Sequence, residues 1–389
     1  MTSPSIETAL SEQANFRFGA VSSHTAFHAI SPSAPPLGPL AAFAGNFTGH
    51  GFNTIFRPDS GQTPTSFPAT PNTTDPADNV LELNLTNETL SFKTPLGSVP
   101  NRGSNSQADA FLNGVPYLQT INDVTVPTQP VGIHFEPGLW MAVPETTVPT
   151  EGATVARMAS IPHGTTIDAQ GTYSAAPGAP AIPAVSITPN FVNGPLHRFQ
   201  NQDAANKATR RIPQDLTSFV AAGTITQAML DDPNTLLRNH IAKQTITSTT
   251  TILISTDPQA ALFGGGTDNI AFLLGDPTGQ ADPNANATQM TAAFWIETVQ
   301  YELEVPAMPY GTPPRRILAP TGEAGQPIPR FLLDPPHAID KPRKITVTST
   351  QIQYSQRVLL VFNGLVWPHV SVATLVPEYA VKIPASAWQ

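Results

Sequence analysis

The sequence predicts a mainly β protein built around one large core, and its composition carries that prediction. Short runs rich in Thr, Val, Ile and Phe alternate with stretches punctuated by 42 Pro and 26 Gly. Such a pattern is typical of many strands joined by long loops rather than of a helical bundle. Only 12% of the 389 residues are charged and 40% are hydrophobic, so the chain can bury a substantial core.

Length alone permits either two ordinary domains or one enlarged β domain. Residues 1–36 are polar and rich in Pro and Ser, which indicates an extended N-terminal arm. We predict a single domain over residues 37–389. Two Pro-rich segments, at about 174–290 and 306–342, are expected to be insertions into it.

Charge and cysteine content exclude several classes of protein. The net charge is −9, and basic residues gather only at Arg210-Arg211 and Arg315-Arg316, so no nucleic-acid partner is expected. No run of apolar residues is long enough to predict a membrane span. The absence of cysteine excludes disulfides, iron–sulfur clusters and thiolate-bound haem. Because no secretory signal pattern opens the chain, we expect a cytoplasmic protein, with a homo-oligomer left open.

Alternating apolar residues predict the strands in chain order. The expected strands span 43–56, 80–92, 110–121, 132–143, 153–161, 165–173, 245–256, 292–305 and the two runs around Asn363-Gly364. The run at 80–92 is interpreted as a hairpin that turns at Thr86-Asn87, and the run at 110–121 as a strand pair or a bulged strand. Interleaved glycines in the first run indicate a strand that bends at a barrel corner.

A sequence pattern typical of helices is confined to residues 212–243. Pro213 suits a first helical position, and Gly223 suits a helix stop. Thr224 with Gln227 matches a capping box. Three short helices are therefore predicted, forming a lid or a flank inserted into the sheet.

One strand gathers groups that can carry chemistry. In 132–143 the period of two places His134, Glu136 and Trp140 on one face. With His163, in the turn that follows, His134 and Glu136 could form a two-histidine, one-carboxylate site for non-haem iron. The alternative is a buried carboxylate and imidazole that hydrogen-bond to each other and to the backbone.

A second candidate lies at the start of the last strand. His369 follows Trp367-Pro368 and precedes small side chains, so its imidazole is placed to offer a nitrogen to the inside of a barrel. The alternative is a solvent-exposed histidine at the strand start.

Three segments together resemble the nitrobindin family of haem-binding barrels. LAAFAGNFTGHGFN, from Leu40, is similar to that family's opening strand, with Phe47 where Trp is usual. IHFEPGLWMAVPE and the strands after it resemble a His-x-Glu-x-Gly stretch, matched by His134 and Glu136. SQRVLLVFNGLVWPHVSVATL resembles the terminal hairpin, in which His369 falls on the position of the proximal histidine.

The resemblance implies a lipocalin-like antiparallel β-barrel with large insertions, and haem b as its cofactor. His369 would bind the iron, and His134 would lie close to the ring with Glu136 orienting it. Aromatic residues would line the macrocycle; those expected to do so are Phe47, Trp140 and Trp367. NO binding and peroxynitrite isomerisation are the activities implied.

We therefore expect a haem-dependent, peroxidase- or oxygenase-like barrel with an open iron position. It would act on a peroxide or an NO-type species, and an apolar organic substrate could share the barrel. His134 and Glu136 are the expected catalytic residues. Two alternatives stay open: a metal-free lipocalin-like carrier or cyclase, and a non-haem iron enzyme that uses His134, Glu136 and His163.

Overall fold

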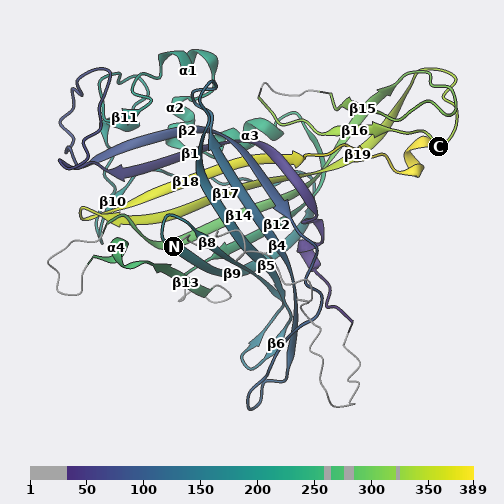
Figure 1. Cartoon of the computed structure of the whole chain (residues 1–389), viewed down its shortest axis with the longest axis horizontal. Helices are drawn as coiled ribbons and strands as arrows, with labels where there is room; N and C mark the ends of the chain where they lie inside the picture. The colour runs from purple at the N-terminus through teal and green to yellow at the C-terminus, as the bar shows by residue number, and fades with distance from the viewer. Residues whose placement is uncertain (1–32, 258–263, 276–283, 321–324) are drawn as a thin grey trace, which may run out of the picture.

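A closed antiparallel β-barrel forms the body of the protein (Figure 1). The computed structural model describes residues 33–257, 264–275, 284–320 and 325–389. The ten wall strands are β1 (Gly45–Pro58), β2 (Asn79–Phe92), β4 (Ala110–Asp123), β5 (Val131–Val143), β8 (Thr154–Ile161), β9 (Thr165–Pro177), β12 (Thr245–Ser255), β14 (Asn286–Val305), β17 (Arg343–Phe362) and β18 (Leu365–Pro377). Each pairs with the wall strand before it in the chain, and β18 pairs with β1 to close the ring. The predicted mainly β fold is confirmed.

One wall strand is interrupted. Ser255, at the end of β12, and Gly264, at the start of β13 (Gly264–Asn269), both pair with Gln170 of β9. β13 thus continues the line of β12 along β9. The side chains of Thr267 and Asn269 donate hydrogen bonds to the carbonyl of Ala287 in β14. Together these contacts extend the wall between β9 and β14.

Glycines allow β1 and β18 to approach closely where the barrel bends. A Cβ added at Gly49 would lie only 2.0 Å from the carbonyl oxygen of Thr374 in β18. Glycine is therefore required at this position of β1 by the close approach of β18.

β2 and β4 are each single continuous strands. The predicted hairpin at Thr86-Asn87 is wrong, because β2 pairs with β1 over its whole length, from Asn79 to Phe92. The turn at Asn363-Gly364 is confirmed: φ is 48° at Asn363 and 74° at Gly364, as a two-residue hairpin turn requires.

The segment between β9 and β12 covers part of the outer wall (Figure 1). It contains β10 (Asn190–Phe191), β11 (Arg211–Ile212), α1 (Thr217–Ala222), α2 (Gln227–Asp231) and α3 (Thr235–Ile241). Its apolar side chains pack with outward-facing residues of the wall, among them Phe52, Phe56 and Trp367. Because β12 and β14 are wall strands, this insertion is shorter than the predicted 174–290. The three predicted helices are present, but Thr226, not Thr224, caps α2.

A small sheet packs against the far ends of β14 and β17. It consists of β15 (Arg315–Leu318), β16 (Arg330–Leu333) and β19 (Val381–Lys382). Its core joins Phe331 and Leu333 to Leu303 and Ile345 of the long strands. The short elements β3 (Val99–Asn101), β6 (Thr146–Thr147), β7 (Thr150–Glu151) and α4 (Ala271–Leu274) lie in connections.

Of the predicted N-terminal arm, residues 1–32 lie outside the described part of the chain. Within the described ranges, no helix is long and apolar enough to cross a membrane.

Candidate functional site

The barrel encloses a cavity of about 500 Å³ at one end. The strand segments around it are the end of β1, the start of β2, the start of β5, the β8–β9 turn, the start of β14, the end of β17 and the start of β18. Its polar lining comprises Asn53, Glu82, Asn84, His134, His163, Thr165, Asn284, Gln356 and His369, and its apolar lining includes Ile55, Ile133, Ile161, Ile167, Met290, Val358 and Leu360. The volume is in the range of cofactor and small-ligand sites.

His369 lies on the cavity wall in a defined protonation state. Its Nδ1 is 3.0 Å from the carbonyl oxygen of Thr54, which can only accept a hydrogen bond. Nδ1 therefore carries the hydrogen, and Nε2 keeps a lone pair. Burial lowers the pKa of His369 to about 4; the Thr54 bond opposes the shift, and His134 and His163 add to it. The imidazole is consequently neutral at neutral pH.

His134 and His163 stand on the opposite side of the barrel from His369. In the strand order, β5 and β8 are four and five strands away from β18, about half of the ring. The His134 and His163 ring centroids are 6.1 Å apart. The Nε2 of His163 lies 3.1 Å from the carbonyl oxygen of Ile133. Both opposing walls therefore bring imidazoles to one space.

Glu136 fixes the orientation of His134. Its Oε2 is 3.0 Å from the Nε2 of His134, and its Oε1 accepts hydrogen bonds from Tyr117 and Arg157. Burial alone would raise the pKa of Glu136, but the Arg157 guanidinium and the bonds from His134 and Tyr117 hold it at about 2. Glu136 is thus an ionised carboxylate with both oxygens engaged, as the hydrogen-bonded alternative predicted.

A second buried carboxyl group continues this polar layer. Glu88 accepts hydrogen bonds from Tyr354 at 2.6 Å, Thr86 at 2.7 Å and Gln119 at 3.3 Å. Burial raises its pKa despite these bonds. We call Glu88, Tyr117, Glu136, Arg157 and Tyr354 the polar belt. These five inward-facing side chains come from β2, β4, β5, β8 and β17, and all of them are buried.

The aromatic residues expected around a macrocycle lie elsewhere. Phe47 packs against Phe92 and Trp140 against Phe294, inside the tightly packed part of the barrel. Trp367 stacks on Phe362 at a centroid distance of 4.7 Å, in the cluster under the insertion. None of the three predicted aromatic residues belongs to the cavity lining.

The predicted non-haem iron set is not assembled. In the described part of the chain, no three His, Asp or Glu side chains gather as a metal site. The reason is visible at Glu136, whose oxygens face Arg157, Tyr117 and His134.

Sequence reasoning missed several groups at this site. Asn53 and Gln356 line the cavity, Arg157 sets the charge of Glu136, and the Thr54 carbonyl fixes the tautomer of His369. A period-two count from Gly49 and Gly51 would have placed Asn53 on the inner face. Arg157 and Thr54 left no signal, because their roles depend on which side chains strand pairing brings together: β8 beside β5 for Arg157, and β1 beside the distant β18 for Thr54.

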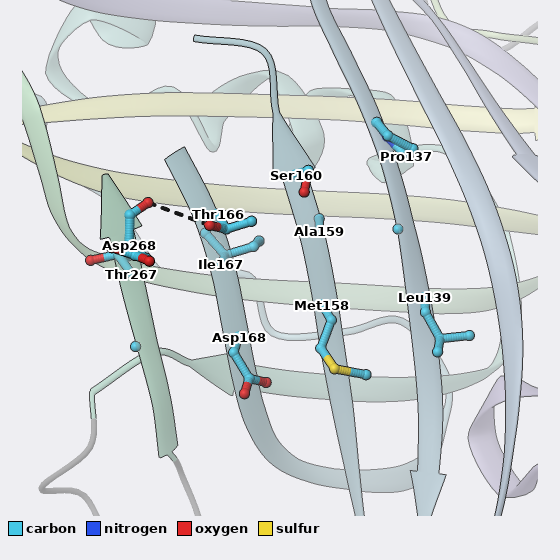
Figure 2. Close-up of a pocket in the computed structure, with 12 residues that line it drawn as sticks. Pro137, Leu139, Met158, Ala159, Ser160, Thr166, Ile167, Asp168, Thr267 and Asp268 are labelled. Atoms are coloured by element: carbon cyan, nitrogen blue, oxygen red, sulfur yellow. Dashed lines mark hydrogen bonds between the residues drawn. The ribbon is translucent and has the colours of Figure 1, made fainter. Parts of the chain in front are cut away.

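Two hollows also lie on the outer wall. One is a groove over β5, β8, β9 and β13 with a volume of about 610 Å³. Figure 2 shows Leu139, Met158, Asp168 and Asp268 along it. The second, of about 520 Å³, runs along β12, β14 and β17. Neither is lined by an imidazole. The interior cavity is therefore the better candidate for chemistry.

No family model, curated protein or solved structure matches this chain. The fold and the site define its class: a closed, ten-stranded antiparallel barrel that holds a histidine-lined interior cavity.

Proposed function

We propose that this protein binds haem in the barrel cavity, with His369 as the axial ligand of the iron. The observation that carries the proposal is the state of His369: a neutral imidazole on the cavity wall whose Nδ1 is held by the Thr54 carbonyl. This is the arrangement that metal-bound histidines use, with one ring nitrogen fixed by a carbonyl and the other free to coordinate.

Much of the rest of the cavity wall is apolar. Aliphatic side chains from opposing walls line it, including Ile133 and Ile161 on one side and Val358 and Leu360 on the other. The resemblance of the His134 and His369 segments to nitrobindins supports the same assignment. It also supports a reaction with a peroxide or an NO-type species, of the peroxidase or oxygenase kind.

His369 would hold the haem, and the haem would supply the redox chemistry toward a small oxidant. The protein's own contribution comes from the wall opposite His369. His134 is oriented by an ionised Glu136, so its ring can hold or pass a proton at a fixed place. Arg157 keeps Glu136 ionised and takes no direct part in the proposed reaction.

The test is reconstitution of the haem-free protein with haemin, read by the absorption band at about 400 nm that haem proteins show. His369→Ala should abolish the band, and free imidazole should restore it by entering the space of the lost ring. His240→Ala is the matched control: His240 is also buried, with its pKa lowered to about 4 and Nδ1 bound to Thr374, but it does not line the cavity.

His134→Ala should retain the band and alter the pH dependence of peroxide consumption. A protein that takes up no haemin, or a His369→Ala variant whose spectrum equals that of the wild type, would contradict the proposal.

A second candidate is a metal-free carrier of an apolar small molecule. It is favoured by one observation, the predominance of aliphatic side chains on the cavity wall. The same reconstitution separates the two, because a carrier binds its ligand without a coordinated iron and without dependence on His369.

A further inference from the structure

The floor of the cavity is a row of uncharged polar side chains. Register places Asn84 of β2 beside Asn53 of β1, Asn53 beside Ser371 of β18, and Ser371 beside Gln356 of β17. All four side chains are nine-tenths or more buried. His369 precedes Ser371 by two residues on the same face of β18. The row therefore lies deeper in the barrel than His369, by one inward-facing position along the strand. We call these four residues the amide row.

Both hydrogen-bonding roles are present on the amide row. Arg157 donates to the Oε1 of Gln356 at 2.7 Å, which leaves the side-chain NH₂ of Gln356 as a donor toward the cavity. The NH₂ of Asn84 donates to Asp123 at 3.1 Å, which leaves its oxygen as an acceptor. Neither of these two remaining groups has a hydrogen-bond partner among the described residues.

Asn53 stands between them with its amide unused. It makes no hydrogen bond to any described residue, and its side-chain oxygen is enclosed without a partner. An unsatisfied buried amide costs on the order of a hydrogen bond, so a group that bonds to it gains that energy on binding. Because nothing holds the Asn53 amide, it can turn to suit a ligand.

We propose that the amide row binds the hydroxyl group of an apolar alcohol or phenol. A hydroxyl accepts from Gln356 and donates to the unpaired side-chain oxygen of Asn53, which matches the mixed row. A carboxylate can only accept, and no cation on the row would neutralise it. The aliphatic walls above the row cover the apolar body. This inference rests on the proposed function, since it names the organic substrate of the same cavity.

The test compares three probes of one shape on the haem-free wild-type protein by calorimetry. p-Cresol carries the hydroxyl, 4-methylanisole keeps only the acceptor oxygen, and 4-methylbenzoate is an anion. p-Cresol should bind about tenfold tighter than either analogue, the value of one net hydrogen bond. Equal affinity for p-cresol and 4-methylanisole, or tighter binding of 4-methylbenzoate, would overturn the assignment.

Variants locate the site. Asn53→Leu should erase the preference for p-cresol over 4-methylanisole, because it removes the acceptor of the hydroxyl hydrogen. Gln356→Leu should weaken the binding of both probes and keep the preference, because both probes carry the oxygen that accepts from Gln356. The matched control, Gln289→Leu, removes an amide from the outer face of β14 and should keep the preference. If a variant fails to fold, the wild-type probe series still decides. A preference that survives Asn53→Leu would also overturn the assignment.

Failure here and failure of haem binding are distinguishable. The phenol measurements need no haem, and the haemin spectrum needs no phenol. A protein that binds haemin but does not discriminate the probes loses only the amide row. A protein that discriminates the probes but gives no band at about 400 nm loses only the haem.

Discussion

The two ends of the barrel interior are built from the same strands and have opposite character. At the packed end, Phe43 stacks on Phe92 at 4.5 Å, and Trp140 meets Phe294 edge-on at 5.0 Å. At the open end, shorter and polar side chains leave a cavity of about 500 Å³. β1 alone shows the change, with Phe47 in the packed end and Asn53 in the cavity lining.

The polar belt marks the change from one end to the other. Arg157 lies over the rings of Tyr117, Trp140 and Phe294 at 5.3 to 5.6 Å, and it also bonds to Gln356 of the cavity lining. Buried charges need their partners in place, so the belt cannot be displaced by aromatic side chains without a large penalty. A buried layer of fully paired charges can therefore set the depth of a barrel cavity.

The largest expected effect comes from breaking this layer. Arg157→Met leaves Glu136 as a buried carboxylate without its cation, and we expect a loss of about 3–5 kcal/mol of unfolding free energy. Urea denaturation at pH 7 measures it. The double variant with Glu136→Gln removes both charges and should recover most of the loss. A single variant within about 0.5 kcal/mol of the wild type would show that the belt is not a structural boundary.

A matched pair of truncations on β1 comes next. Phe47 is 3% exposed inside the packed end, so Phe47→Ala should cost about 3–5 kcal/mol through lost contacts and a new void. Ile55 faces the same way along the strand but already borders the cavity, so Ile55→Ala should cost about 1 kcal/mol. Denaturation midpoints give both values. Equal losses would mean that the two ends are equally packed.

The same two variants also distinguish between two roles for Phe47, contact with a haem and packing in the core. The resemblance placed it against a haem, whereas the structure packs it against Phe92. Phe47→Ala should therefore leave haemin affinity unchanged in whatever fraction of the protein remains folded, and Ile55→Ala should alter it.

Much of the fold could be predicted from local patterns in the sequence. Period two placed His134, Glu136 and Trp140 on one face of a strand, and the structure turns all three inward, to the cavity, the belt and the packed end. Asn363-Gly364 marked the last hairpin because only a few residue types accept positive φ at both positions. The continuity of β2 was missed, because polar residues at Thr86 and Asn87 resemble a turn until β1 pairs alongside.

The candidate site was only partly visible in the sequence. His134 and His369 were identified because the position of a residue in a strand predicts whether its side chain faces into the barrel. The partners that set their chemistry, Thr54 and Arg157, lie on neighbouring strands, and the pairing of strands leaves no local signal in the sequence. The aromatic residues illustrate the same limit: Trp367 is near His369 in sequence, yet it packs under the insertion.

The smallest expected effect concerns pH and sharpens the comparison between cavity and packed wall. His369 and His240 both have a pKa of about 4 in the folded protein against an ordinary value of 6.5. Between these values the unfolded chain binds a proton that the folded protein does not. Their contribution to stability is therefore full above about pH 6.5 and is lost as pH falls toward about 4.

Replacing either histidine with Leu should flatten that loss, measured by urea denaturation at intervals from pH 7 to pH 4.5. His240 is 4% exposed, so His240→Leu should remove roughly 2 kcal/mol of the pH-dependent change. His369 borders the cavity, where water can screen an imidazolium, so His369→Leu should remove roughly 1 kcal/mol. If His369→Leu had the larger effect, the cavity would be drier than its polar lining implies, and the contrast between the two ends would be one of shape alone.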